Sequence, residues 1–394
     1  MSGGPEAMRR VIVVLAIAGF ASTFGFRMID PLVPDIARNL GVSVATAASL
    51  ATSYALTYSV AQPFFGPLGD AYGKILLIRI GSCAMALAFL ATAFAPDFLS
   101  LSVARGLTGV AAGGIIPLIF ATLADRVPLA QRQVVIGRFL FAMLAAQLCG
   151  TAGAGMMASF IGWRGVFLVA AAIAFAAFLA VSLFLESGRQ PGAEPFSLGG
   201  MVSRYRRIFA DRRAQAVFGL VAIEGVLLMG AQPYVAAILQ ERAPVGAFEA
   251  GLVIAGIGIG GLLYSLSVGW LVSHISQRSF FFVGTAMAAT ALACFGIAAP
   301  WYVDAGFFVL LGFGFMMGHN TLQVLATELA PEARGSAISL FAFSFFLGQA
   351  IGPLVFGGLY HALGAAIALA SYAAAILAFG IGAATLLFGR PRTD

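Results

Sequence analysis

The sequence predicts an all-α integral membrane protein with twelve transmembrane helices in two pseudo-symmetric six-helix halves. Of its 394 residues 61% are hydrophobic and only 10% are charged. A soluble domain has about 25% charged residues, so this composition indicates a membrane-embedded chain. The apolar runs are continuous and do not alternate with polar residues, which predicts helices and not barrel strands.

Twelve apolar runs are long enough to cross a bilayer as a helix, which takes about 20 residues. They lie near 11–33, 46–65, 75–95, 99–121, 134–159, 164–185, 214–239, 248–271, 280–299, 305–327, 336–359 and 364–388. A connector between the sixth and seventh runs contains Pro191, Gly192 and Pro195, followed by several arginines. We therefore expect two six-helix bundles, at 1–187 and 214–394, joined by a cytoplasmic linker at 188–213.

The two halves repeat one another at a nearly constant spacing. Gly66-x-Leu68 matches Gly269-x-Leu271 at a shift of 203 residues, and Asp30-Pro31 matches Gln232-Pro233 at 202. Two parallel six-helix repeats place a substrate cavity at their interface, near the middle of the bilayer. Positions kept in both halves serve the architecture. Polar residues found in one half only are the better functional candidates: Arg27, Asp30, Asp70, Arg105 and Glu224.

The basic residues predict the orientation, because cytoplasmic loops carry an excess of lysine and arginine. One set of loops carries most of them: Arg9, Arg10, Lys74, Arg126, Arg132, Arg204, Arg206, Arg207, Arg212, Arg213, Arg278, Arg334, Arg390 and Arg392. The opposite loops carry little beyond Arg38, Arg164 and Arg242. Both termini are therefore expected in the cytoplasm. The net charge of +6 reflects this bias and predicts no nucleic-acid partner.

A short polar segment, Gly66-Pro67-Leu68-Gly69-Asp70-Ala71-Tyr72-Gly73-Lys74, separates the second and third runs and predicts a tight turn. It resembles the loop between helices two and three of the major facilitator superfamily, and this resemblance extends over the whole chain. The family resemblance implies that Gly66, Asp70, Gly73 and Lys74 form a conformational latch on the cytoplasmic side. Asp70 would then meet the start of helix eleven near Gly335 and Ser336.

Arg105 begins a pattern of residues spaced by four, Arg105-x3-Gly109-x3-Gly113-x3-Pro117. That spacing places them along one stripe of a helix. A charge inside a span is costly and faces a cavity or a partner. The pattern resembles the helix-four motif of proton-coupled facilitators, whose arginine takes part in proton coupling. A structural arginine bonded to the backbone is the alternative.

Arg27 and Asp30 lie three residues apart in the first span, on one face of a helix and at a depth similar to that of Arg105. Three interpretations stay open. Asp30 could be a proton site governed by two arginines, the group could bind an anionic substrate, or Arg27 and Asp30 could be an ion pair at the membrane edge. Arg27 also argues against a cationic substrate.

Glu224 is the most deeply placed acid, about ten residues and thus ~15 Å into the seventh span. Loss of hydration at that depth favours its neutral form, which suits reversible protonation. We predict Glu224 as the main proton carrier, with a hydrogen-bonded structural carboxyl as the alternative. The predicted walls of the substrate cavity include Arg27 and five other polar side chains: Gln147, Gln232, His319, Asn320 and Gln323.

The overall pattern resembles the drug or sugar-efflux branch of the family, which implies a proton-coupled antiporter of the bacterial inner membrane working by alternating access. A helix-five glycine motif, Gly150 to Gly155, is similar to that of family exporters, although the usual proline after Gly150 is missing. Expected partners are a small-molecule substrate, protons and the bilayer, and a monomer is expected. No phosphate-binding loop, catalytic constellation or metal motif is present in the sequence, so we expect neither an enzyme nor a cofactor. The alternatives are a proton symporter for a small organic anion and a ligand sensor that transports nothing.

Overall fold

The computed structural model describes residues 5–127, 129–187, 196–297, 299–329 and 334–388. The described part contains helices and no strands. The first half contains α1 (Pro5–Arg27), η1 (Asp30–Leu32), α2 (Val33–Leu40), α3 (Val44–Tyr72), α4 (Lys74–Ala93), α5 (Phe98–Gly113), α6 (Ile115–Arg126), α7 (Leu129–Leu148), the π-helical turn η2 (Cys149–Gly153) and α8 (Ala154–Phe184). The second half contains α9 (Leu198–Phe209), α10 (Arg212–Met229), η3 (Gln232–Tyr234), α11 (Val235–Arg242), α12 (Ala247–His274), α13 (Gln277–Phe295), α14 (Trp301–Glu328) and α15 (Arg334–Phe388).

These elements make twelve membrane crossings. Nine segments of the described chain are apolar and long enough to span a bilayer. Two of them contain a sharp kink at a glycine with positive φ, Gly162 in α8 and Gly364 in α15, and each therefore makes two crossings. The twelfth crossing is α3, whose 29 residues are rich in serine, threonine and tyrosine. The predicted twelve spans are thus confirmed in number and order.

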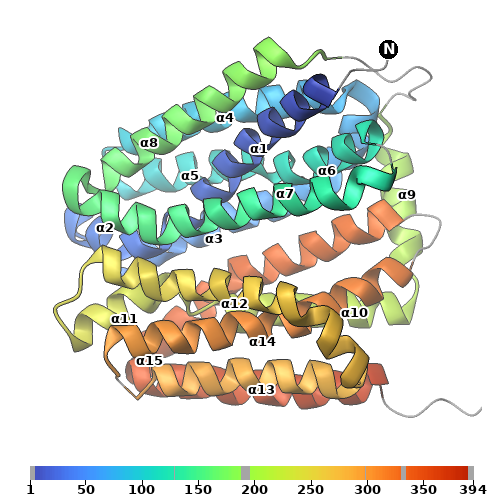
Figure 1. The fold of residues 1–394 in the computed structure, drawn as a ribbon. Helices are drawn as coiled ribbons and strands as arrows, with labels where there is room; N and C mark the ends of the chain where they lie inside the picture. The colour runs from blue at the N-terminus through green and yellow to red at the C-terminus, as the bar shows by residue number, and fades with distance from the viewer. Residues whose placement is uncertain (1–4, 128, 188–195, 298, 330–333, 389–394) are drawn as a thin grey trace, which may run out of the picture.

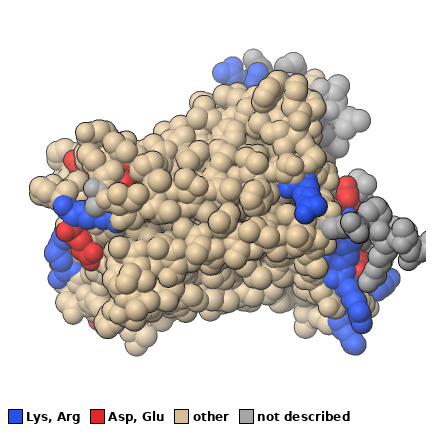
Figure 2. Space-filling view, turned by 90° about the horizontal axis from the view of Figure 1, so that it is seen from below, with Lys and Arg blue, Asp and Glu red and all other residues tan. Residues whose placement is uncertain are grey.

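The two halves form two layers of helices that run along a common direction (Figure 1). The first half, blue to green, lies above the second half, yellow to red, and α9 lies across one end of both. We call that end of the molecule the α9 end and the other, where α2 and α11 lie, the α2–α11 end. Figure 2 shows a broad uncharged belt between the two ends, with charged side chains gathered at the ends, as a bilayer-spanning protein requires.

A proline breaks the first membrane-spanning helix of each half at the same place. Helix α1 ends at Arg27 and a 3-10 turn follows at Asp30–Leu32, while α10 ends at Met229 and a 3-10 turn follows at Gln232–Tyr234. Pro31 and Pro233 lack the N–H that a continuous helix needs, so the chain changes helical form there. The sequence predicted that Arg27 and Asp30 share one face of a regular helix. This prediction is wrong because the helix ends between them, although both residues line the same pocket.

The turn after the second span is shorter than the predicted one. Helix α3 continues through Gly66 and Pro67 to Tyr72, and α4 begins at Lys74, so only Gly73 is outside both helices. Gly73 has φ +102°, a conformation that glycine adopts readily and other residues rarely do. The segment from Gly66 to Tyr72 is therefore the last part of a helix.

The connector between the halves contains a helix that the sequence analysis did not predict. Ser197 caps α9 by accepting a hydrogen bond from the backbone N–H of Gly200, at 3.1 Å. The Tyr205 hydroxyl donates to the backbone carbonyl of Pro63 in α3, at 2.8 Å. Residues 188–195 of the predicted linker, and Arg390 and Arg392, lie outside the described residues.

The halves pack closely where glycines let backbones meet. A Cβ atom on Gly155 would lie 2.1 Å from the carbonyl oxygen of Ala247, and one on Gly251 would lie 2.6 Å from that of Thr151. These contacts join η2 and α8 of the first half to α12 of the second half near the α2–α11 end. Figure 1 shows α7 and α12 moving apart from there toward the α9 end. In this conformation the α2–α11 end is the closed one.

Candidate functional site

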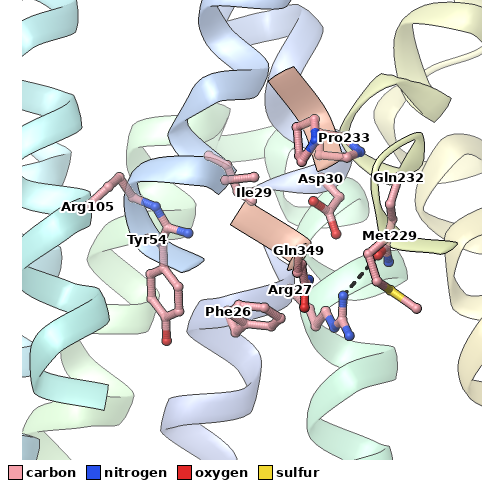
Figure 3. Close-up of a pocket in the computed structure, with 12 residues that line it drawn as sticks. Phe26, Arg27, Ile29, Asp30, Tyr54, Arg105, Met229, Gln232, Pro233 and Gln349 are labelled. Carbon is pink, nitrogen blue, oxygen red and sulfur yellow. Dashed lines mark hydrogen bonds between the residues drawn. The ribbon is translucent and has the colours of Figure 1, made fainter. Parts of the chain in front are cut away.

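A polar pocket lies between η1 and η3, at the interface of the two halves. Its walls include Arg27, Asp30 and Arg105 from the first half and Gln232 and Gln349 from the second. Figure 3 shows Arg27, Asp30 and Gln232 converging there. The Arg27 Nη1 atom donates to the Oε1 atom of Gln232 at 3.0 Å, which links the halves directly. The sequence prediction of an Arg27–Asp30–Arg105 cluster agrees with this geometry.

The pocket is narrow as well as polar. Its free volume is about 10 Å³, roughly the space that one water molecule needs. Asp30 is only 5% exposed. In this conformation the pocket can hold a water or a proton but no organic substrate.

Arg105 is completely buried, at 0% exposure. Its Nη1 atom donates to the backbone carbonyl of Gly25 at 3.1 Å, and its guanidinium carbon lies 4.5 Å from the centre of the Tyr54 ring. Figure 3 shows its guanidinium group beside Tyr54, on the opposite side of the pocket from Gln232. Its Nε and Nη2 atoms have no hydrogen-bond acceptor among the described residues. An unpaired buried donor is costly, so these N–H groups are available to a water or a ligand.

Aromatic rings close the interface beside the pocket. Phe26 lies 5.0 Å from Tyr54 and 5.7 Å from Phe346, and Tyr58 lies 4.6 Å from Phe346, between ring centres. Phe346 belongs to the second half, so these contacts join α1 and α3 to α15. The sequence analysis did not identify this cluster. The spacing of Tyr54 and Tyr58 by four residues was the available signal, since it places both rings on one helix face.

The second polar centre lies within the second half, where Glu224 of α10 meets His319 of α14. The Oε2 atom of Glu224 lies 2.9 Å from the Nδ1 atom of His319. Glu224 is fully buried, and its Oε1 atom has no hydrogen-bond donor among the described residues. The sequence analysis named both residues but assigned them separate roles, because nothing along the chain shows that position 224 faces position 319.

Aromatic side chains surround His319. The rings of Phe315, Phe341 and Phe345 have their centres 5.0, 5.0 and 4.6 Å from the centre of the imidazole. The His319 side chain retains 17% exposure while the Glu224 side chain has 1%. The imidazole is therefore the partly exposed member of the pair, and the carboxyl group of Glu224 is the buried member.

The other predicted cavity residues lie at different positions. Asn320 donates from Nδ2 to the Tyr264 hydroxyl at 2.7 Å, which joins α14 to α12. Gln323 is exposed, and the Gln147 Nε2 atom lies 3.1 Å from the Cβ position of Gly258 in α12. None of these three residues lines the polar pocket.

The two charged residues of the predicted latch, Asp70 and Lys74, form ion pairs inside the first half. Lys74 lies 2.5 Å from the Oδ2 atom of Asp125 and 3.5 Å from the Oδ1 atom of Asp70. The Asp70 side chain is 70% exposed, and Gly66 has open space where a Cβ atom would lie. Among the described residues no hydrogen bond or ion pair joins Asp70 to Gly335 or Ser336.

No group of three or more histidine, cysteine or acidic side chains in the described part of the chain could hold a metal ion. The sequence profile of the Major Facilitator Superfamily matches residues 15–353 and, in a second match, 217–394. The chain belongs to the Major Facilitator Superfamily. It is therefore a multi-pass membrane transporter of that family, with the family's two-bundle fold.

Similar proteins of this family cover nearly the whole chain. An uncharacterized MFS-type transporter, YwfA of Bacillus subtilis, is 24% identical over 93% of this chain and 90% of its own length. A multi-drug resistance efflux pump PmrA homolog of Lactococcus lactis is 27% identical over 94% and 91%. The multidrug resistance protein MdtG of Enterobacter lignolyticus is 22% identical over 90% and 86%.

Proposed function

We propose that this chain is a proton-coupled efflux transporter, an antiporter of small hydrophobic or drug-like molecules or sugars that works by alternating access. The observation that carries the proposal is the buried Glu224–His319 pair. A carboxyl group with one unpaired oxygen is expensive to bury, and intramembrane acids of this kind mark proton and substrate pathways. The names of two of the similar proteins, a multi-drug resistance efflux pump homolog and a multidrug resistance protein, support the substrate class.

In this mechanism the proton resides on the Glu224–His319 pair in one conformation and leaves it in the other. The imidazole can accept or donate a proton at either ring nitrogen. A proton reaching His319 from water can pass along the 2.9 Å hydrogen bond to Glu224. Protonation removes the carboxylate charge, so the pair carries a different charge before and after exchange, and the protein can couple that change to substrate release.

Arg27 and Asp30 serve as a gate in the same scheme. The Arg27–Gln232 hydrogen bond exists only while the α2–α11 end is closed, and the pocket beside it is too narrow for a substrate. Opening this end separates Arg27 from Gln232 and leaves Asp30 as its nearest acidic partner. Lys74, Asp70 and Asp125 lie toward the α9 end, and we propose that they reorganise when that end closes.

We also propose a bacterial inner membrane location with both termini and α9 in the cytoplasm. The excess of lysine and arginine at the α9 end supports this orientation. The closed α2–α11 end would then face the outside. The structure would represent an inward-facing conformation, and the two six-helix halves need no second copy to form the interface.

The experiment is transport of a fluorescent lipophilic dye and of a radiolabelled sugar in proteoliposomes with an imposed proton gradient. Glu224→Gln should abolish gradient-driven transport, because an amide cannot release a proton. Glu328→Gln is the matched control, an exposed acid at the end of the same α14 that carries His319, and should transport normally. Gradient-driven transport in Glu224→Gln would contradict the assignment of the carrier.

A second candidate is proton symport of a small organic anion, which the unpaired Nε and Nη2 atoms of Arg105 favour. The same proteoliposomes test it with a small radiolabelled carboxylate. Uptake that follows the proton gradient and is lost in Arg105→Gln would support this candidate over efflux. Ligand binding without any transport in the unchanged chain would indicate a sensor.

A further inference from the structure

Helix α9 has an apolar surface that the rest of the described chain leaves open. Leu198, Val202 and Phe209 are 54%, 45% and 36% exposed. At 100° per residue these three side chains fall within about 40° of one another on the helix. They form one stripe, which we call the α9 stripe.

The α9 stripe lies beside the contact that holds the helix to the protein. Met201 and Ile208 are buried, at 7% and 8% exposure, and they occupy the adjacent sector of the helix. Tyr205 lies between that sector and the stripe, and its hydroxyl donates a hydrogen bond to the backbone carbonyl of Pro63. The apolar side chains of α9 therefore cover a wider sector of the helix than the sector that contacts the protein. The α9 stripe is the apolar sector without such a contact among the described residues.

The charge of this segment has one sign. Residues 196–213 contain five arginines, Arg204, Arg206, Arg207, Arg212 and Arg213, and a single acid. That acid, Asp211, is occupied as the cap of α10, where it accepts from the N–H of Arg213 at 2.8 Å. Arg204, Arg206 and Arg207 are exposed, and Arg206 borders the α9 stripe on its outer side.

The position of the helix places this surface at the edge of the bilayer. Figure 1 shows α9 lying across the ends of the spanning helices, so its axis runs along the membrane plane. Figure 2 shows the uncharged belt ending in a group of basic side chains at one end of the molecule. A helix with this division of apolar and basic residues, at this depth, has the form of an interfacial helix.

We infer that α9 is a lipid-binding helix whose stripe inserts at the acyl-chain boundary and whose arginines bind anionic headgroups. The lipid acyl chains would bury Leu198, Val202 and Phe209, which the rest of the described chain leaves exposed. Arg204, Arg206 and Arg207 meet phosphate-bearing anionic lipids, for which guanidinium groups have a fitting geometry. Because Tyr205 ties α9 to α3, the lipid surface then holds the linker against the first half.

Tryptophan fluorescence in lipid nanodiscs tests this inference without any transport measurement. Val202→Trp places the probe on the stripe, and Ser203→Trp is the matched control one residue away on the polar side. The unchanged chain supplies the background from Trp163, Trp270 and Trp301. Lipids brominated on the acyl chain should quench the probe at 202 about twofold more than the probe at 203, because only the stripe reaches the acyl region.

The headgroup is tested by exchanging brominated phosphatidylglycerol for brominated phosphatidylcholine. Quenching at 202 should fall in the neutral lipid and fall again on combining Val202→Trp with Arg204→Gln, Arg206→Gln and Arg207→Gln. Arg38→Gln at the α2–α11 end is the control and should leave quenching unchanged. Equal quenching at 202 and 203, or identical quenching at 202 in both lipids, would overturn the inference.

Discussion

At the scale of single residues, the two polar centres differ in what holds them. Glu224 and His319 belong to one half, so a rigid-body movement of one half against the other would leave their hydrogen bond intact. Arg27 and Gln232 belong to different halves, so their hydrogen bond depends on the conformation. A pair inside one half suits a group that carries a proton through the cycle, while a pair between halves suits a gate.

Replacing Gln232 by leucine should weaken the closed α2–α11 end. A hydrogen bond to a charged group contributes about 1.5–3 kcal/mol, and Gln232→Leu leaves Arg27 without its acceptor. The measurement is the rate at which a membrane-impermeant maleimide labels Ala51→Cys, a wall position of the pocket, in a chain without its three native cysteines. We expect faster labelling in Gln232→Leu.

Gln240→Leu is the matched control for that experiment. Gln240 accepts from Arg38 at 3.1 Å across the same interface, but this pair is exposed to solvent. Exposed charged contacts contribute about 0–1 kcal/mol, so labelling should change little. Equal acceleration by both substitutions would mean that burial does not distinguish the two contacts.

At the scale of helices, close backbone contacts decide which surfaces can meet. Gly260 brings α12 against α14 inside the second half, where a Cβ atom would lie 2.0 Å from the carbonyl oxygen of Val309. Gly155 and Gly251 bring the two halves together in the same way. Small residues let membrane helices approach closely. In this protein they do so both inside the second half and at the interface between the two halves, which alternating access would require to open.

A methyl group at position 155 should destabilise this conformation. The alanine Cβ in Gly155→Ala would overlap the backbone of Ala247, which cannot rotate away as a side chain could. Overpacking costs about 1–3 kcal/mol, so the melting temperature in detergent should fall. Gly219→Ala, in the exposed part of α10 with nothing within 4 Å, should melt at the same temperature or slightly higher. Equal melting temperatures of the two variants would contradict this prediction, because they would mean that α8 and α12 can move apart without loss of stability.

At the scale of the whole molecule, the charge distribution predicts the orientation in the membrane. Basic residues cluster at the α9 end, and such loops stay in the cytoplasm. Cysteine labelling in intact cells tests this. Ala243→Cys, just beyond α11, should react with an impermeant maleimide from outside, and Ser203→Cys in α9 should react only after permeabilisation. The reverse pattern would invert the proposed direction of every step in the cycle.

The structure brings some of the predicted site residues together and places others apart. The grouping of Arg27, Asp30 and Arg105 followed from their similar depths in two spans, and the structure brings all three to one pocket. The turn at Gly66–Lys74 was predicted too long, because glycine and proline indicate turns but also occur near the end of a membrane helix. Helix α9 was missed because its short apolar stripe is half exposed and follows a stretch rich in proline and glycine.

The amino-acid sequence alone determined the membrane environment, the twelve crossings, the twofold repeat and the family. Those properties depend on hydropathy, length and spacing, which are summed along the chain and need no knowledge of neighbours. Only the tertiary structure decided that Glu224 faces His319, that Arg27 reaches Gln232, and that the interface is closed at the α2–α11 end. These contacts depend on how the helices rotate and tilt against one another, and that packing is set by side chains distant in sequence.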